Sequence, residues 1–262
     1  MKPRQVTATL ITLGLFLGTA VFVRAVMASE AYQSLRRSAF DAWGIDLSTI
    51  LMWSTFAIVA VIGVALVVGA RAGRIIAEFG LNRPVVPACV FALVASLPML
   101  IGYAVMSGGS ISIGSSLIVA ALIAPFIEEL FFRGWAFRQL CQRAKWGFWP
   151  AALFTGLVFG LMHVPFRTLL EMNLGMDDLS TVLITGAGGV FFAWLFMAWG
   201  WNLWVPILLH AMMNGWWAIF AIAEGAVGGM EASILRGLTI AAAVLLTIFR
   251  KRIPGLRAGQ VD

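Results

Sequence analysis

Long apolar runs, separated by short polar connections, dominate the pattern of residues along this chain. A helix needs about 20 mostly apolar residues to cross a bilayer. Runs of that kind occupy residues 6–25, 49–69, 85–106, 115–134, 150–169, 180–199, 202–222 and 233–250. Pro98 lies inside the third run and predicts a kink there. The pattern predicts an all-α, polytopic membrane bundle of about eight transmembrane helices, with residues 1–262 forming a single integral membrane domain.

The composition supports this membrane class. Hydrophobic residues make up 61% of the 262 residues, charged residues make up 11%, and the mean hydropathy is +0.95. A soluble domain is closer to half apolar and a quarter charged. The net charge of +6 does not indicate nucleic-acid binding, because no basic stripe on a soluble face is visible. We therefore expect the lipid bilayer as a partner, and no nucleic acid.

The basic residues predict the orientation. With the N-terminus inside, thirteen Lys and Arg residues fall on the inner side, and Arg236 lies within the last run. The outer side holds four: Arg24, Arg36, Arg37 and Arg167. Because cytoplasmic connections carry the excess of Lys and Arg, both termini are predicted to be cytoplasmic. We expect a multi-pass protein of the bacterial inner (plasma) membrane.

Some polar residues interrupt the apolar runs. An ionisable group inside a bilayer costs roughly 2.5–3.5 kcal/mol on insertion scales, so such groups usually face the bundle interior and mark function. Both histidines of the chain are among them. The candidates are Glu128, Glu129, Arg133, His163, His210 and Arg236, joined by the hydrogen-bonding amide of Asn214. A separate motif, "GAGG" at 186–189, suggests close helix packing.

Helical spacing sorts the candidates of the fourth run. Glu129 and Arg133 are i,i+4 neighbours and can pair. Glu128 points about 100° away and has no partner on its own helix. One carboxylate is therefore predicted to be held by the arginine, and the other to be available for chemistry.

The distance of each candidate from its helix end shows whether candidates on different runs lie at a similar depth in the membrane. At 1.5 Å per residue, Glu128 lies roughly 9 Å from the cytoplasmic helix end, His210 about 12 Å and Asn214 about 18 Å. His210 and Asn214 are also i,i+4 neighbours on one helical face. His163 comes out at about 20 Å, so it joins the others only if its helix starts later or the preceding segment dips into the bilayer.

Each candidate has a plainer structural explanation. The Glu129–Arg133 pair can brace a helix end, a histidine can pack through one hydrogen bond, and Asn214 can bond across helices. Their occurrence together favours activation of water and stabilisation of an oxyanion. Two other functions stay open: a proton- or ion-coupled transporter, because such groups also form proton relays, and a non-catalytic binding or immunity protein on the same fold.

Three motifs carry a family resemblance. "EELFFR" (128–133) fits E-E-x-x-x-R, "FGLMH" (159–163) fits F-x-x-x-H, and "HAMMN" (210–214) fits H-x-x-x-N. In this order, and on separate predicted helices, they resemble the CPBP intramembrane proteases (CAAX proteases and bacteriocin-processing enzymes, also called the ABI family). The resemblance covers about residues 115–222, which would form the catalytic core.

The resemblance implies an intramembrane endopeptidase whose cavity opens to the cytoplasm and whose substrate is a membrane-associated protein or peptide, CAAX-like or other. It implies that Glu128 is the general base and that His163 holds and polarises the attacking water. His210 and Asn214 would donate hydrogen bonds to the oxyanion. The residues expected to brace the site or contact substrate are Glu129, Arg133 and Phe159.

The sequence is compatible with both a zinc-dependent and a metal-free reaction. Glu128, His163 and His210 could ligate Zn²⁺, with water as the fourth ligand. However, no H-E-x-x-H motif places two ligands on one helix. The family was first described as metalloproteases, whereas a glutamate-dependent reaction without metal is now favoured for it. We therefore expect that no cofactor is required, with Zn²⁺ as the alternative.

Overall fold

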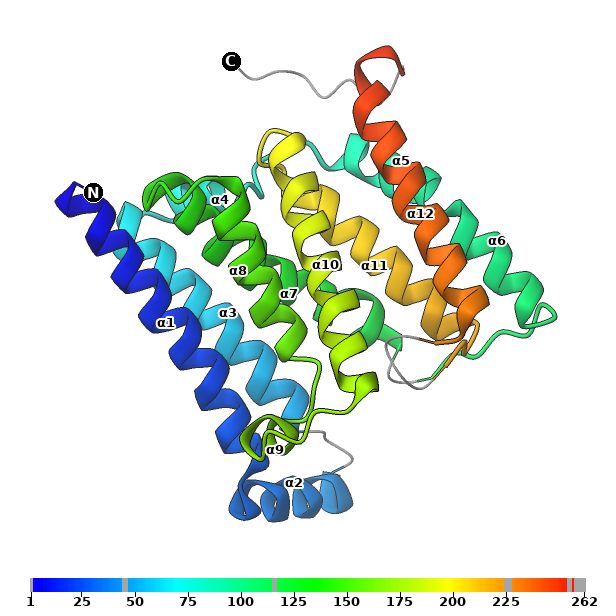
Figure 1. The fold of residues 1–262 in the computed structure, drawn as a ribbon, viewed down its shortest axis with the longest axis horizontal. Helices are drawn as coiled ribbons and strands as arrows, with labels where there is room; N and C mark the ends of the chain where they lie inside the picture. Colours follow the sequence, from blue (N-terminus) through cyan, green and yellow to red (C-terminus); the bar gives the residue numbers. More distant parts are fainter. Residues whose placement is uncertain (1, 44–46, 115–116, 224–227, 254–255, 257–262) are drawn as a thin grey trace. The chain divides into compact units, whose positions relative to one another are not determined.

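The computed structural model describes residues 2–43, 47–114, 117–223, 228–253 and 256, and within these ranges every regular element is helical (Figure 1). The α-helices are α1 (Pro3–Ala28), α2 (Glu30–Trp43), α3 (Leu47–Val68), α4 (Ala72–Phe79), α5 (Val85–Ala95), α6 (Leu97–Met106), α7 (Ala124–Glu128), α8 (Phe148–Leu161), α9 (Phe166–Leu170), α10 (Met176–Ala198), α11 (Trp204–Ile219) and α12 (Met230–Phe249). Three π-helical segments and a 3₁₀ turn complete the fold: η1 (Val119–Ile123), η2 (Glu129–Phe137), η3 (Gln139–Arg143) and η4 (Arg250–Arg252). The predicted all-α class is confirmed.

Several helices can cross a membrane. By length and composition these are α1, α10, Ile50–Val68 of α3 and Met230–Arg252, and α5 with α6 makes a fifth if the bent pair is one span. The pair bends by 42° at Ser96, next to Pro98, so the predicted kink is confirmed. The chain is an integral, multi-pass membrane protein. A count of eight spans and the cytoplasmic placement of both termini stay predictions.

The run 150–169 does not form one helix, and this expectation was wrong. α8 ends at Leu161 and α9 begins at Phe166, so His163 lies in the turn between them. The physical reason is Pro165, which has no N–H for a helical hydrogen bond and disfavours helical backbone in the residue before it.

The fourth run also departs from regular α-helix. α7 ends at Glu128, and η2 begins at Glu129. A π-helix makes i→i+5 hydrogen bonds and has a wider turn. The α-helical spacing assumed for Glu129 and Arg133 is therefore corrected, and their pairing stays a prediction.

The chain divides into two compact units. Unit 1 comprises Met1–Glu78 and Leu130–Phe191, and unit 2 comprises Phe79–Glu129 and Phe192–Asp262. In unit 1, α1 lies beside α3 (Figure 1). In unit 2, α5 packs against α11, and α6 against α12.

Aromatic side chains form the core of unit 1 and hold η2 in place. The ring of Phe131 stacks on Phe56 of α3 at 4.4 Å and lies 5.2 Å from Phe16 of α1. Trp135, one turn further on, is fully buried and also contacts Phe16. These large buried surfaces fix the segment that carries Arg133.

Helices α8 and α10 of unit 1 approach each other closely through glycines. A Cβ atom on Gly160 would lie 2.4 Å from the backbone oxygen of Val182, and one on Gly156 would lie 2.8 Å from that of Gly186. The close packing predicted for "GAGG" is confirmed at Gly186 and Gly189, whereas Gly188 has open space around it.

A buried carboxylate joins α4 to η3 in unit 1. Glu78 accepts from the Nε and one terminal nitrogen of Arg143 at 3.1 and 2.9 Å, and from Gln139 at 3.1 Å. Burial alone would raise the pKa of Glu78, but the hydrogen bond from Arg143 and the charges of Arg138 and Arg143 hold it below its ordinary value.

In unit 2, side-chain hydrogen bonds fix the start of α11. The amide of Asn202 donates to the carbonyl of Pro84 at 2.9 Å, and the Trp204 indole donates to that of Leu81 at 2.9 Å. Gly80 has φ +79°, and a Cβ there would meet the backbone oxygen of Trp201. This fastening places the helix that carries His210.

Candidate active site

Two carboxylates and one imidazole come together in unit 2. His210 Nδ1 lies 2.9 Å from Glu129 Oε1, and His210 Nε2 lies 3.8 Å from Glu128 Oε2. Glu129 is fully buried and His210 nearly so. One imidazole of α11 therefore faces both members of the glutamate doublet, which occupies the junction of α7 and η2.

The contact with Glu129 fixes how His210 can act. A carboxylate oxygen is an acceptor, so the contact is a hydrogen bond when His210 is in the tautomer whose Nδ1–H donates to Glu129. The other nitrogen, Nε2, then presents a lone pair when the ring is neutral and a second N–H when it is protonated. Glu129 thus selects the tautomer of His210, as the residue behind a working histidine does in other hydrolytic sites.

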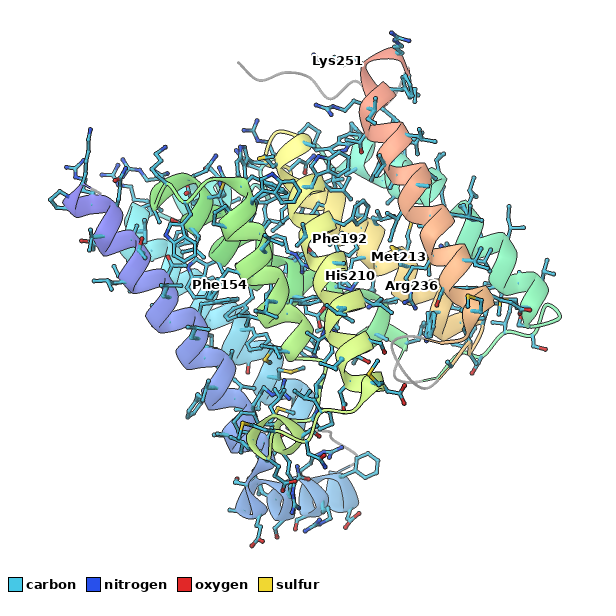
Figure 2. The ribbon with its side chains drawn as sticks, viewed as in Figure 1. Phe154, Phe192, His210, Met213, Arg236 and Lys251 are labelled. Carbon is cyan, nitrogen blue, oxygen red and sulfur yellow. The ribbon has the colours of Figure 1, made fainter. Side chains whose placement is uncertain are left out.

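A phenylalanine sets the plane of the His210 ring. Phe192, near the end of α10, stacks on it with centroids 5.0 Å apart and an interplanar angle of 18° (Figure 2). Sequence reasoning missed this residue, because one aromatic residue in an apolar run looks like any other. It also missed the contact between Glu129 and His210, because Glu129 was expected to pair with Arg133.

Asn214 lies one turn beyond His210. Both belong to α11, which is α-helical from Trp204 to Ile219, so the predicted i,i+4 spacing is confirmed. Asn214 is half-buried. One helical face therefore carries an imidazole and a primary amide.

Unit 1 holds the other three candidates. His163 Nδ1 lies 2.8 Å from the carbonyl oxygen of Phe159, and the two rings pack edge to face at 4.7 Å. The guanidinium of Arg133 lies over the Phe159 ring, 4.4 Å from its centroid. Since a carbonyl only accepts, His163 Nδ1 is the donor, and the neutral ring offers Nε2 as an acceptor.

The structure thus brings the candidates together in two groups. Glu128, Glu129, His210 and Asn214 belong to unit 2, and Arg133, Phe159 and His163 belong to unit 1. The convergence of His163 with Glu128 stays a prediction. Among the described residues, no group of three or more His, Cys, Asp or Glu side chains is arranged to hold a metal ion.

Comparison with known proteins finds a family that resembles the segment carrying these residues. Residues 110–216, about two-fifths of the chain, match the family described as Type II CAAX prenyl endopeptidase Rce1-like. Over 98 residues, the chain is 32% identical to the Bacillus subtilis (strain 168) protein named "Putative membrane peptidase YdiL". This alignment covers 37% of the chain and 34% of the relative, so the chain spans about a third of the length of that relative. No solved structure gives a significant match.

The matched segment contains all the motif residues, from Glu128 to Asn214. The predicted resemblance is therefore confirmed: residues 110–216 of this chain are similar to the Rce1-like family of type II CAAX prenyl endopeptidases.

Proposed function

We propose that the chain is an intramembrane endopeptidase that hydrolyses a peptide bond of a membrane-associated protein, CAAX-like or other, from the cytoplasmic side. The observation that carries the proposal is the arrangement of Glu128, His210 and Glu129 in unit 2. A carboxylate beside an oriented imidazole can take a proton from water while a neighbouring donor stabilises the charge that develops. The family match supports the same reaction class.

In this proposal Glu128 is the general base. It removes a proton from a water molecule, whose oxygen attacks the scissile carbonyl carbon. His163 accepts the second hydrogen of that water through Nε2, the nitrogen that its bond to the Phe159 carbonyl leaves as an acceptor. Both contacts raise the electron density on the attacking oxygen.

The oxyanion is stabilised from α11. His210 donates from Nε2 in its protonated form while Nδ1–H remains bonded to Glu129, and Asn214 adds an amide N–H. Loss of one such donor costs about 10²–10³ in kcat in a comparable site. Arg133 and Phe159 brace the site or contact substrate, and the proposal requires no metal.

The test uses the full chain, purified and reconstituted in liposomes. The probes are a fluorescent farnesylated CAAX peptide and its unprenylated form, supported by proteomics of membrane-protein termini. Glu128→Gln and His163→Ala should abolish cleavage, whereas Glu231→Gln, an exposed carboxylate in the first turn of α12, should retain it. Cleavage that survives Glu128→Gln would refute the mechanism.

Two further measurements separate the alternatives. Proton flux that depends on pH, without peptide cleavage, would favour the transporter. Full activity of metal-stripped protein in a strong chelator would exclude the zinc mechanism, and activity restored only by Zn²⁺ would overturn the metal-free one.

A further inference from the structure

The turn that carries His163 is fastened to the N-terminal helix. Arg24 of α1 donates from Nη1 to the carbonyl of Leu161 at 2.6 Å, and from Nη2 to the carbonyl of Val164. These two carbonyls flank His163 in the sequence. The guanidinium also lies 3.8 Å from the sulfur of Met162 and over the ring of Phe166.

Pro165 explains why this turn can accept an outside donor. In a continuing α-helix the carbonyl of Leu161 would accept from the N–H of residue 165, but proline has none. Locally the Leu161 carbonyl accepts the Val164 N–H, at 3.3 Å, so its second lone pair is available to Arg24. The carbonyls at a helix end lack partners within the helix and must find them elsewhere. A guanidinium, with its planar fork of donors, can serve two carbonyls at once, which a lysine ammonium does less well.

We propose that Arg24 is a positioning residue for His163. Arg24 fixes the backbone on both sides of His163, while the Nδ1–H bond to the Phe159 carbonyl fixes the ring. Together they set the direction of Nε2, the atom assigned to the attacking water. This inference rests on the proposed function for its catalytic consequence, but the positioning itself is a property of unit 1.

The proposal extends the active machinery beyond the family segment. Arg24 lies outside residues 110–216. From the sequence alone, Arg24 was interpreted only as one of the four basic residues on the predicted outer side of the membrane. Arg167, another arginine on the predicted outer side, is exposed and pairs with Glu171. A position on that side therefore does not by itself place an arginine against the turn that carries His163.

The chain's two histidines allow a test that does not depend on activity. Protein labelled with ¹⁵N-histidine gives imidazole signals from His163 and His210 alone, and a His210→Gln variant assigns them. In the wild type, His163 should show a single Nδ1–H tautomer. In Arg24→Gln its signals should broaden and the Nε2–H tautomer should appear, whereas those of His210 should stay unchanged.

Kinetics give the second readout. Arg24→Gln should lower kcat by about 10–100-fold, since a misplacement of about 1 Å costs that much, while KM changes little because substrate contacts are intact. Arg24→Lys keeps the charge and should recover part of the loss. The matched control is Arg37→Gln on exposed α2, which should behave as wild type in both readouts.

The outcomes separate this inference from the proposed function. Unchanged His163 signals in Arg24→Gln would overturn the inference, even if activity fell. Altered His163 signals, with no cleavage of any substrate by the wild type, would support the positioning and refute the protease. Loss of both histidine signals would report unfolding, and Arg24→Lys would then carry the comparison.

Discussion

Gly160 offers a sharp test of the packing between α8 and α10. It is buried three residues before His163, and a Cβ there would lie 2.4 Å from the Val182 backbone oxygen, with two further Val182 backbone atoms at 3.1 and 3.2 Å. Ordinary contact begins at 3.4 Å, so Gly160→Ala must separate the two helices locally by about 1 Å. Because the obstacle is backbone rather than a flexible side chain, no rotamer change relieves it.

The magnitude follows from two opposing effects. Overpacking of this kind typically costs about 1–3 kcal/mol, whereas Ala in place of Gly within a helix contributes about 1 kcal/mol of stability. Gly188→Ala, in α10, is the matched control, because nothing lies within 4 Å of its added Cβ. Both variants gain the same helix propensity, so their difference, about 2 kcal/mol, measures the clash alone.

The assay is thermal unfolding of both variants in the same detergent at one scan rate. A difference of about 2 kcal/mol corresponds to roughly 4–8 °C in Tm for a chain of this size. Gly160→Ala should be the less stable of the two. Equal midpoints would refute the close approach of α8 and α10.

Three further predictions address other contacts. Glu78→Gln should cost about 1 kcal/mol at pH 7, since Arg143 is 48% exposed. Because the pKa of Glu78 is lowered in the fold, this difference in unfolding free energy is present above the ordinary glutamate pKa and should be lost as the pH falls through the lowered one. Thr247→Val leaves the buried Trp199 indole N–H without its acceptor and should cost about 1–3 kcal/mol in denaturant unfolding; unchanged stability would contradict that contact. Glu129→Gln replaces the acceptor of His210 Nδ1–H with an amide, which can donate as well as accept and so no longer fixes the tautomer of the ring. This variant should lower kcat by about 100-fold or more, measured on the cleaved peptide; near-wild-type kcat would contradict the role of Glu129.

Features that depend on a single residue or on the period of a single helix could be predicted from the sequence. The kink at Pro98 and the shared face of His210 and Asn214 follow from the chemistry of one residue and the period of one helix, and both are confirmed. Pro165 carried a signal of the same kind. It was overlooked because the surrounding run is apolar enough to suggest one continuous helix.

Long-range contacts could not be predicted in this way. Arg24 donates to carbonyls 137 and 140 residues further along the chain. Nothing in the neighbouring sequence distinguishes it from a basic residue that only sets the orientation in the membrane. The contact between Glu129 and His210 joins residues 81 positions apart. The π-helical turn at Glu129 was not predicted either, because the apolar pattern of the run suggested an ordinary α-helix.

The interleaving of the two units has a consequence for synthesis in the cell. The core of unit 1 joins Phe16 to Phe131 and Phe132, so α1 enters the membrane long before its aromatic partners exist. At about 5–20 residues per second, the ribosome needs roughly 6–23 s to reach them. During that interval unit 2 begins, and it too is left unfinished until α11 and α12 emerge. Neither unit can therefore complete its fold early in synthesis and independently of the other. Glu128 and Glu129 can contact His210 only when most of the chain has been made.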